Sequence, residues 1–200
     1  MKRPFRWLLL VTLVLGTAAS PALAKQKAKI SELTLMVDET GVGVSFFFEN
    51  CFSRKIEKVI QNGVPVDLTF FIKLHRTRKV VKDKRLAYVK WDRRIHYDNL
   101  KEEYRIFLDE MSPPLVVKDF LEAKETVARV ENAWISPLKP LDERATYSLR
   151  VRAALEPEGP PLRLADLLFF IPSVKVKTDW LVQRFRIGSF VMPKQTGSIR

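Results

Sequence analysis

Cysteine is almost missing from this chain: Cys51 is the only one in 200 residues. No intramolecular disulfide is therefore possible, and the stability of the fold has to come from packing. Phenylalanines surround the thiol, in the stretch Phe46-Phe-Phe-Glu-Asn-Cys-Phe52. This setting predicts a buried thiol that packs as a small apolar side chain rather than a nucleophile.

Catalytic motifs are missing as well. The sequence contains no glycine-rich phosphate loop, no serine nucleophile elbow and no cysteine-histidine spacing typical of a metal or thiol site. We therefore predict no metal site and no cofactor, and a protein that is not an enzyme.

Histidine occurs only at positions 75 and 96, and one of the two lies near carboxylates. If residues 85–96 form a strand that continues extended, Asp92, His96 and Asp98 share one face. An envelope hydrolase that uses these three residues is the alternative function. Alternating charges on a solvated strand face would give the same pattern.

Apolar runs long enough to span a bilayer are lacking. The N-terminal run, residues 7–15, has about half of the about 20 residues that a membrane-spanning helix needs. Basic residues precede it, and it is followed by small residues that end in Ala22-Leu-Ala24. This order predicts a signal peptide, cleaved after residue 24, and export to the periplasm, with no transmembrane domain in the mature form. An uncleaved N-terminal anchor in the inner membrane is the alternative.

Acidic residues are too few to balance the basic ones, so the net charge is +12. Removal of the signal peptide, which holds three basic and no acidic residues, leaves +9 on the remaining 176 residues (200 minus 24). An exported basic protein meets anionic lipid, lipopolysaccharide and polyanionic glycans. We expect an anionic envelope component or an envelope protein as the partner, and no nucleic acid.

Alternating apolar and polar residues dominate the mature chain. In residues 66–76, Val66, Leu68, Phe70, Ile72 and Leu74 fall on one face, and Lys73 and His75 on the other. Residues 147–155 repeat this pattern, with Arg150 and Arg152 on the outer face. Both patterns are typical of half-buried antiparallel strands. Further strands are expected at residues 33–37, 42–48, 85–96, 104–109, 174–176 and 180–187, with turns at residues 38–41 and 98–101.

Two segments have helical spacing instead. Residues 53–63 place Ile56, Val59 and Ile60 on one side, with Ser53 as the N-cap and Gly63 as the stop. Residues 117–132 are the second predicted helix. The fold class is therefore mainly β, or α+β: one antiparallel β-sandwich-like domain over residues 25–192 with about two short helices, followed by a disordered tail, 193–200. The three tryptophans outside the predicted signal, Trp91, Trp134 and Trp180, are expected to pack in the core.

Several stretches resemble a bacterial family of exported proteins, the domain of unknown function 4390 (DUF4390). They are Asn62-Gly-Val-Pro-Val66, Arg94-Ile-His-Tyr97 with Glu103-Tyr104, Ser148-Leu-Arg-Val-Arg152 and Thr178-Asp-Trp180. The resemblance spans most of residues 30–190. It implies the same order of strands in the same compartment, and an accessory role beside an envelope sensor kinase, but no chemistry. The basic stretch 79–85 departs from the family pattern.

Basic side chains recur at spacing two on several predicted strands, which places each pair on one face. If these strands adjoin, Lys73, His75, Arg150 and Arg152 form a cationic face suited to phosphate or carboxylate groups. Cross-strand pairing with acidic residues would serve solubility instead. We therefore predict a non-catalytic binding or protein-interaction module with a basic surface.

One apolar segment, residues 167–171, stands apart between prolines. It is too short to span a bilayer. Its predicted place is a buried turn at one end of the sandwich. If Leu168, Phe169 and Phe170 are exposed, they become the candidate patch for a partner.

Overall fold

A computed structural model of the chain describes residues 27–38, 40–109, 111–137, 141–158 and 175–189. Three predictions lie outside these residues: the signal peptide, the tail 193–200, and the candidate patch at Leu168, Phe169 and Phe170. Among the described residues, no helix is both long enough and apolar enough to cross a membrane.

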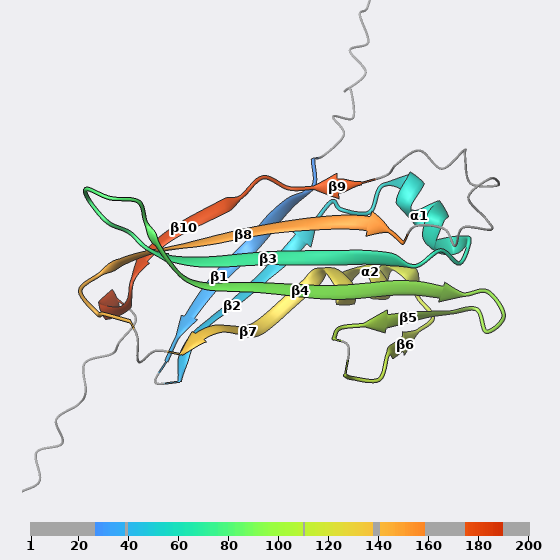
Figure 1. Ribbon diagram of the computed structural model, residues 1–200. Coiled ribbons are helices and arrows are strands. Elements are labelled where there is room, and N and C mark those ends of the chain that lie inside the picture. The colour runs from blue at the N-terminus through green and yellow to red at the C-terminus, as the bar shows by residue number, and fades with distance from the viewer. Residues whose placement is uncertain (1–26, 39, 110, 138–140, 159–174, 190–200) are drawn as a thin grey trace, which may run out of the picture.

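A seven-stranded antiparallel sheet forms one layer (Figure 1). Its strands are β10 (Leu181–Arg186), β8 (Thr146–Pro157), β3 (Val66–Arg76), β4 (Lys84–Asp98), β5 (Glu103–Phe107) and β6 (Leu115–Val117), in that spatial order, and β9 (Val176–Lys177), which also pairs with β8. A 3-10 turn, η1 (Ile187–Ser189), follows β10. The long strands β3, β4 and β8 therefore lie at the centre of this layer.

A three-stranded sheet forms the second layer, in the order β1 (Lys29–Val37), β2 (Gly41–Glu49) and β7 (Arg129–Pro137). The predicted hairpin between the first two strands is confirmed, since the backbone N–H of Asp38 donates to the carbonyl of Gly41 over 3.1 Å. A Cβ atom on Gly41 would lie only 2.2 Å from the carbonyl oxygen of Ser136. Glycine is thus required here because β7 approaches closely.

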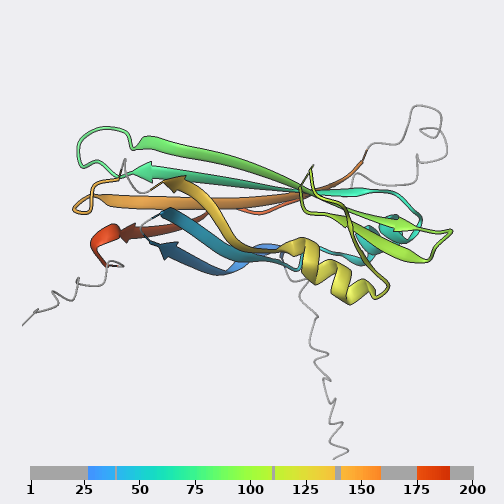
Figure 2. The ribbon, with the colours of Figure 1, turned by 90° about the horizontal axis from the view of Figure 1, so that it is seen from below.

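The core lies between the two sheets, which Figure 2 shows one above the other. Alternate residues of β3 point into it, and the five predicted from the sequence are all at most 1 % exposed. The ring of Phe70 meets those of Phe46 and Phe48 from the small sheet edge-on, at centroid distances of 5.3 and 6.2 Å. The prediction of a β-rich α+β domain built as a sandwich is confirmed.

Helix α1 (Arg54–Gln61) agrees with the prediction. The hydroxyl oxygen of Ser53 accepts from the backbone N–H of Ile56, and Gly63 has a φ of 75°, a conformation that favours glycine. Cys51, just upstream, is 1 % exposed, and its thiol donates to the carbonyl of Phe48 over 3.1 Å. The predicted burial of this thiol is confirmed, and burial raises the pKa of Cys51 to about 12.

The second predicted helix is too long. Helix α2 (Phe120–Ala128) starts after its N-cap, Asp119, and ends where β7 begins. Strand β7 was missed because its alternation is broken: Asn132 has a φ of 48°, and the register with β2 shifts between Val44 and Phe46. Pairing with β2 overrides the helical spacing of residues 129–132. The short strand β6 was missed as well.

Candidate functional site

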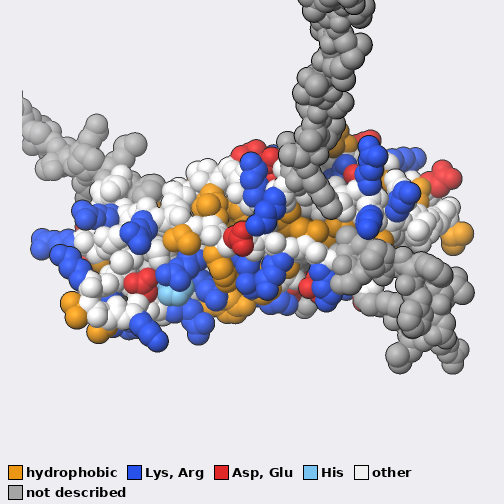
Figure 3. Space-filling view, turned by 90° about the horizontal axis from the view of Figure 1, so that it is seen from above, with side chains coloured by type: hydrophobic (Ala, Val, Ile, Leu, Met, Phe, Trp, Pro, Cys, Tyr) orange, Lys and Arg blue, Asp and Glu red, His pale blue; other side chains and the backbone are white. Residues whose placement is uncertain are grey.

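The predicted basic residues lie together on the large sheet. Strands β3 and β8 are neighbours, and their register places Lys73 opposite Arg150, Phe71 opposite Arg152, and His75 opposite Ser148. All of these side chains point away from the small sheet, on what we call the outer face. Lysines and arginines gather with hydrophobic side chains and a histidine along the lower border of the molecule in Figure 3.

Aromatic rings hold two of these cations in place. The ring of Trp180 has the Lys73 Nζ at 4.5 Å from its centroid, and the guanidinium carbon of Arg152 at the same distance. The Arg152 guanidinium also lies 4.9 Å from the ring of Phe71, and Lys73 Nζ lies 5.7 Å from the ring of Tyr88. We call this group the basic–aromatic cluster; it comprises Lys73, His75, Arg150 and Arg152 with Phe71, Tyr88 and Trp180.

Trp180 is held there by the residues just before it. The backbone N–H of Thr178 donates to the carbonyl of Ala153 over 2.9 Å, and the Thr178 hydroxyl accepts from the backbone N–H of Ala153 over 3.1 Å. Thr178 is 5 % exposed, so these bonds are shielded from water. The segment is thereby fixed to β8, and Trp180 lies over the cations of β3 and β8.

Carboxylates balance only part of this positive charge. Arg150 pairs with Asp83 over 3.0 Å. Within the described residues, neither Lys73 nor Arg152 forms an ion pair, and the partners recorded for both are aromatic rings. Surface charge pairing therefore explains Arg150 but not the other two cations.

Several polar atoms in and beside the cluster are buried without a hydrogen-bond partner among the described residues. They are His75 Nδ1, Ser148 Oγ, Arg150 Nε and Arg152 Nε, with Thr77 Oγ1 just beyond the end of β3. Nearly all buried polar atoms in folded proteins find a partner, so five in one region are unusual. The described residues thus leave hydrogen-bonding capacity unused in and beside the cluster.

The pKa of His75 is lowered from its ordinary value, first by burial and then by the positive charge of Arg150, with smaller contributions from Lys73 and Arg85. Asp83 acts in the opposite direction. We expect the NMR titration midpoint of His75 to lie below about 6.5, and to rise in Arg150→Gln, where one repelling charge is gone.

The lowered pKa has a consequence for stability. As the pH falls, the imidazole of residue 75 binds a proton in the unfolded chain before it does so in the folded one. The free energy of unfolding of wild type should therefore decrease relative to that of His75→Gln below about pH 6.5. The same pH dependence of this free energy in both proteins would contradict the prediction.

The alternative catalytic residues lie on a different part of the outer face. Strand β4 stays extended through Asp98, so Asp92, His96 and Asp98 do share one face. Asp92, however, accepts from the Thr69 hydroxyl and from Lys90 Nζ, each over 2.6 Å.

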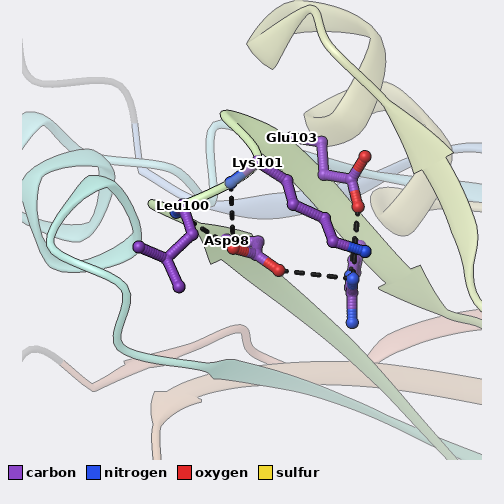
Figure 4. A network of polar contacts seen from close by, with 5 residues as sticks. Asp98, Leu100, Lys101 and Glu103 are labelled. Atoms are coloured by element: carbon purple, nitrogen blue, oxygen red, sulfur yellow. Dashed lines mark hydrogen bonds and ion pairs between the residues drawn. The ribbon is translucent and has the colours of Figure 1, made fainter.

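The carboxylate of Asp98 is also engaged by hydrogen bonds and an ion pair within the chain. It accepts from the backbone N–H groups of Leu100 and Lys101 in the turn that follows (Figure 4), and it pairs with Arg105 over 3.3 Å. Hydrogen bonds and ion pairs within the chain lower the pKa of both Asp98 and Asp92 despite partial burial. Such carboxylates remain ionised, which does not favour a general acid among them. Among the described residues, no group of three potential metal ligands comes together.

A groove of about 810 Å³ lies beside the basic–aromatic cluster on the outer face and shares Phe71 with it. Phe107 and Ala154 add to its apolar lining. Its Arg94 is paired with Asp67 over 2.6 Å. The groove therefore extends the cluster with surface whose charges are more nearly balanced.

Comparison with protein families gives a match over residues 25–184 to the model of a domain of unknown function (DUF4390). The chain belongs to the DUF4390 family. Comparisons with curated proteins and with solved structures give no significant match.

In this member of the DUF4390 family, the structure gives the Thr178-Asp-Trp180 motif a role. Thr178 fixes the segment to β8, Asp179 accepts from Lys27 Nζ over 2.7 Å, and Trp180 stacks between two cations. Trp180 and Trp134 were predicted to lie in the core, and this was wrong: Trp134 is 50 % exposed, and Trp180 lies on the outer face. Trp91, in contrast, packs against the core as expected.

Proposed function

We propose that this protein is a non-catalytic periplasmic binding module, whose basic–aromatic cluster binds phosphate or carboxylate groups of an anionic envelope component. The observation that supports this most is that Lys73 and Arg152 stack on Trp180 without an ion pair among the described residues. Stacking fixes the position of a cation while its N–H groups stay available to an anion. The predicted export signal supports the compartment, and the family resemblance supports an accessory role beside an envelope sensor kinase.

The geometry of the cluster suits an anion with several oxygens. Lys73 of β3 faces Arg150 of β8, and Arg152 follows two residues further along β8 on the same face. Strands that pair in a sheet lie about 4.8 Å apart, so one phosphate or carboxylate group is within reach of more than one of these side chains. Charge-assisted hydrogen bonds from arginine are the strongest that a protein surface offers to such groups.

Binding of inorganic pyrophosphate, followed by NMR at the indole N–H of Trp180, tests the proposal. Wild type should show saturable shifts that weaken with added salt. The double variant Lys73→Gln, Arg152→Gln should bind at least about tenfold more weakly, because each lost charged hydrogen bond contributes roughly 1.5 kcal/mol or more.

A matched control removes two charges elsewhere. Arg54 and Lys55 are exposed on α1, far from the cluster in the fold, and Arg54→Gln with Lys55→Gln should change the affinity less than about twofold. Equal weakening by the two double variants would show a general charge effect and would overturn the proposal. So would the absence of saturable shifts in wild type.

A further inference from the structure

The loop between β3 and β4 has two exposed aliphatic residues at its centre. Val80 and Val81 are 94 % and 59 % exposed, although valine is a residue that usually lies inside a fold. The loop is at one end of the long β3–β4 pair (Figure 1). Nothing in the packing of the described residues explains why an aliphatic pair stands at this position.

Cations surround the two valines. Five basic side chains occur within residues 78–85, and all are exposed: Arg78, Lys79, Lys82, Lys84 and Arg85. None of the five forms an ion pair with another described residue. The one acid of this stretch, Asp83, is engaged by Arg150 of β8 over 3.0 Å. We call residues 78–85 the hairpin tip; it combines an apolar point with an unbalanced positive charge.

This combination suits the surface of an anionic membrane. The transfer of aliphatic side chains from water into the boundary between headgroups and acyl chains is favourable, and basic residues near the surface are attracted by anionic lipid. Two valines alone are a weak anchor, and five cations alone would bind any polyanion. Together they favour a bilayer, which offers both an apolar layer and a charged plane.

We propose that the hairpin tip docks the protein onto a bilayer of anionic phospholipid, with Val80 and Val81 inserted below the headgroups and the five cations in contact with lipid phosphates. This inference rests on the proposed function in that it names the surface at which the basic–aromatic cluster works. The ion pair of Asp83 with Arg150 joins the tip to the cluster. A docked tip therefore brings the cluster towards the same membrane.

The opposite end of β4 provides a matched control. Leu100 is 97 % exposed in the turn between β4 and β5, at the other end of the molecule (Figure 1). Its charged neighbours are Asp98, Lys101, Glu102 and Glu103, which carry a net negative charge. An exposed aliphatic residue in a net negative surrounding is thus present in the same protein, and it should not dock.

Site-directed labelling separates the two ends. Cys51 is buried and its thiol has a pKa raised to about 12, so a new cysteine at Val80→Cys or Leu100→Cys is the one that reacts with an environment-sensitive dye. With phosphatidylglycerol vesicles, the emission of the Val80→Cys conjugate should shift to the blue. The Leu100→Cys conjugate should not shift, and phosphatidylcholine vesicles should shift neither.

Co-sedimentation with the same vesicles measures the contribution of each part. Val80→Ser with Val81→Ser should lower the partition coefficient about tenfold, since two aliphatic side chains no longer leave water. Lys79→Gln with Lys82→Gln should lower it by about fivefold for each charge. Unchanged partitioning in both variants, or equal dye shifts at the two ends, would overturn the proposal, as would equal binding to phosphatidylcholine.

The outcomes also separate this inference from the proposed function. The cluster variant Lys73→Gln, Arg152→Gln should keep the dye shift at position 80, and the serine variant of the tip should keep the pyrophosphate shifts at Trp180. Loss of pyrophosphate binding alone overturns the proposed function. Absence of the dye shift alone overturns the membrane docking, and leaves an anionic group outside the bilayer as the ligand of the cluster.

Discussion

Phe70→Ala is expected to lower the free energy of unfolding by about 3–5 kcal/mol, the range typical of a fully buried phenylalanine. Phe70 lies in the middle of β3 and is 0 % exposed. Its ring contacts Phe46 and Phe48 of the small sheet, and the guanidinium of Arg93 lies 5.7 Å from its centroid. Truncation would leave a cavity at the point where the two sheets meet, which neither sheet can fill without bending.

The neighbouring residue is the control for this prediction. Phe71 has the same chemistry on the same strand, but it points to the outer face and is half-buried. Phe71→Ala should lower the free energy of unfolding by about 1 kcal/mol, because this truncation removes less buried apolar area than Phe70→Ala does. Urea unfolding followed by circular dichroism gives both values. Equal decreases in the free energy of unfolding for the two variants would show that packing between the two sheets does not make Phe70 special.

The sequence predicts those parts of the fold that local patterns determine. The alternation of β3 identified its core residues because neighbouring side chains of a strand point to opposite faces. Helix α1 was recognisable from Ser53 and Gly63, and the β1–β2 hairpin from the glycine of its turn. In each case the signal lies within a dozen residues.

Features set by contacts between distant segments could not be predicted. Strand β7 follows α2 directly and is broken by the left-handed residue Asn132, so its pattern is not periodic. It becomes a strand because β2 offers it an edge.

The same limit applies to the candidate site. The alternation of each strand predicted that Lys73, His75, Arg150 and Arg152 face outward, but their meeting depends on the pairing of β3 with β8. Trp180 was assigned to the core by analogy with Trp91, and nothing local shows that two cations flank it. The spacing from Thr178, which fixes the segment, is a signal that could have found it.

Arg93→Met is expected to lower the free energy of unfolding by about 2–4 kcal/mol, since one side chain connects three elements. Arg93 is on the inward face of β4, and its Nη1 donates to the carbonyls of Val127, over 3.2 Å, and of Arg129, with a longer contact to that of Thr126. These carbonyls lie where α2 ends and β7 begins. Removal of the guanidinium leaves them without a charged donor in a partly buried site.

The electrostatics of Arg93 make its role distinct from that of a surface arginine. Burial lowers its pKa to about 10, so the side chain is still protonated at neutral pH although it is shielded from water. A positive charge at the end of a helix also offsets the negative end of the helix dipole. The guanidinium thus replaces the glycine or asparagine that ends many helices, and it allows α2 to pass into β7 without a loop.

Arg94, the next residue, is the matched control, since it points to the outer face and pairs with Asp67 at 40 % side-chain exposure. Arg94→Met should cost less than about 1 kcal/mol, as exposed ion pairs do. Chemical denaturation measures both variants, and hydrogen exchange of the amides of β7 locates the loss. If Arg93→Met is as mild as Arg94→Met, or if exchange in β7 is unchanged, the junction of α2 and β7 is held by packing and not by this guanidinium.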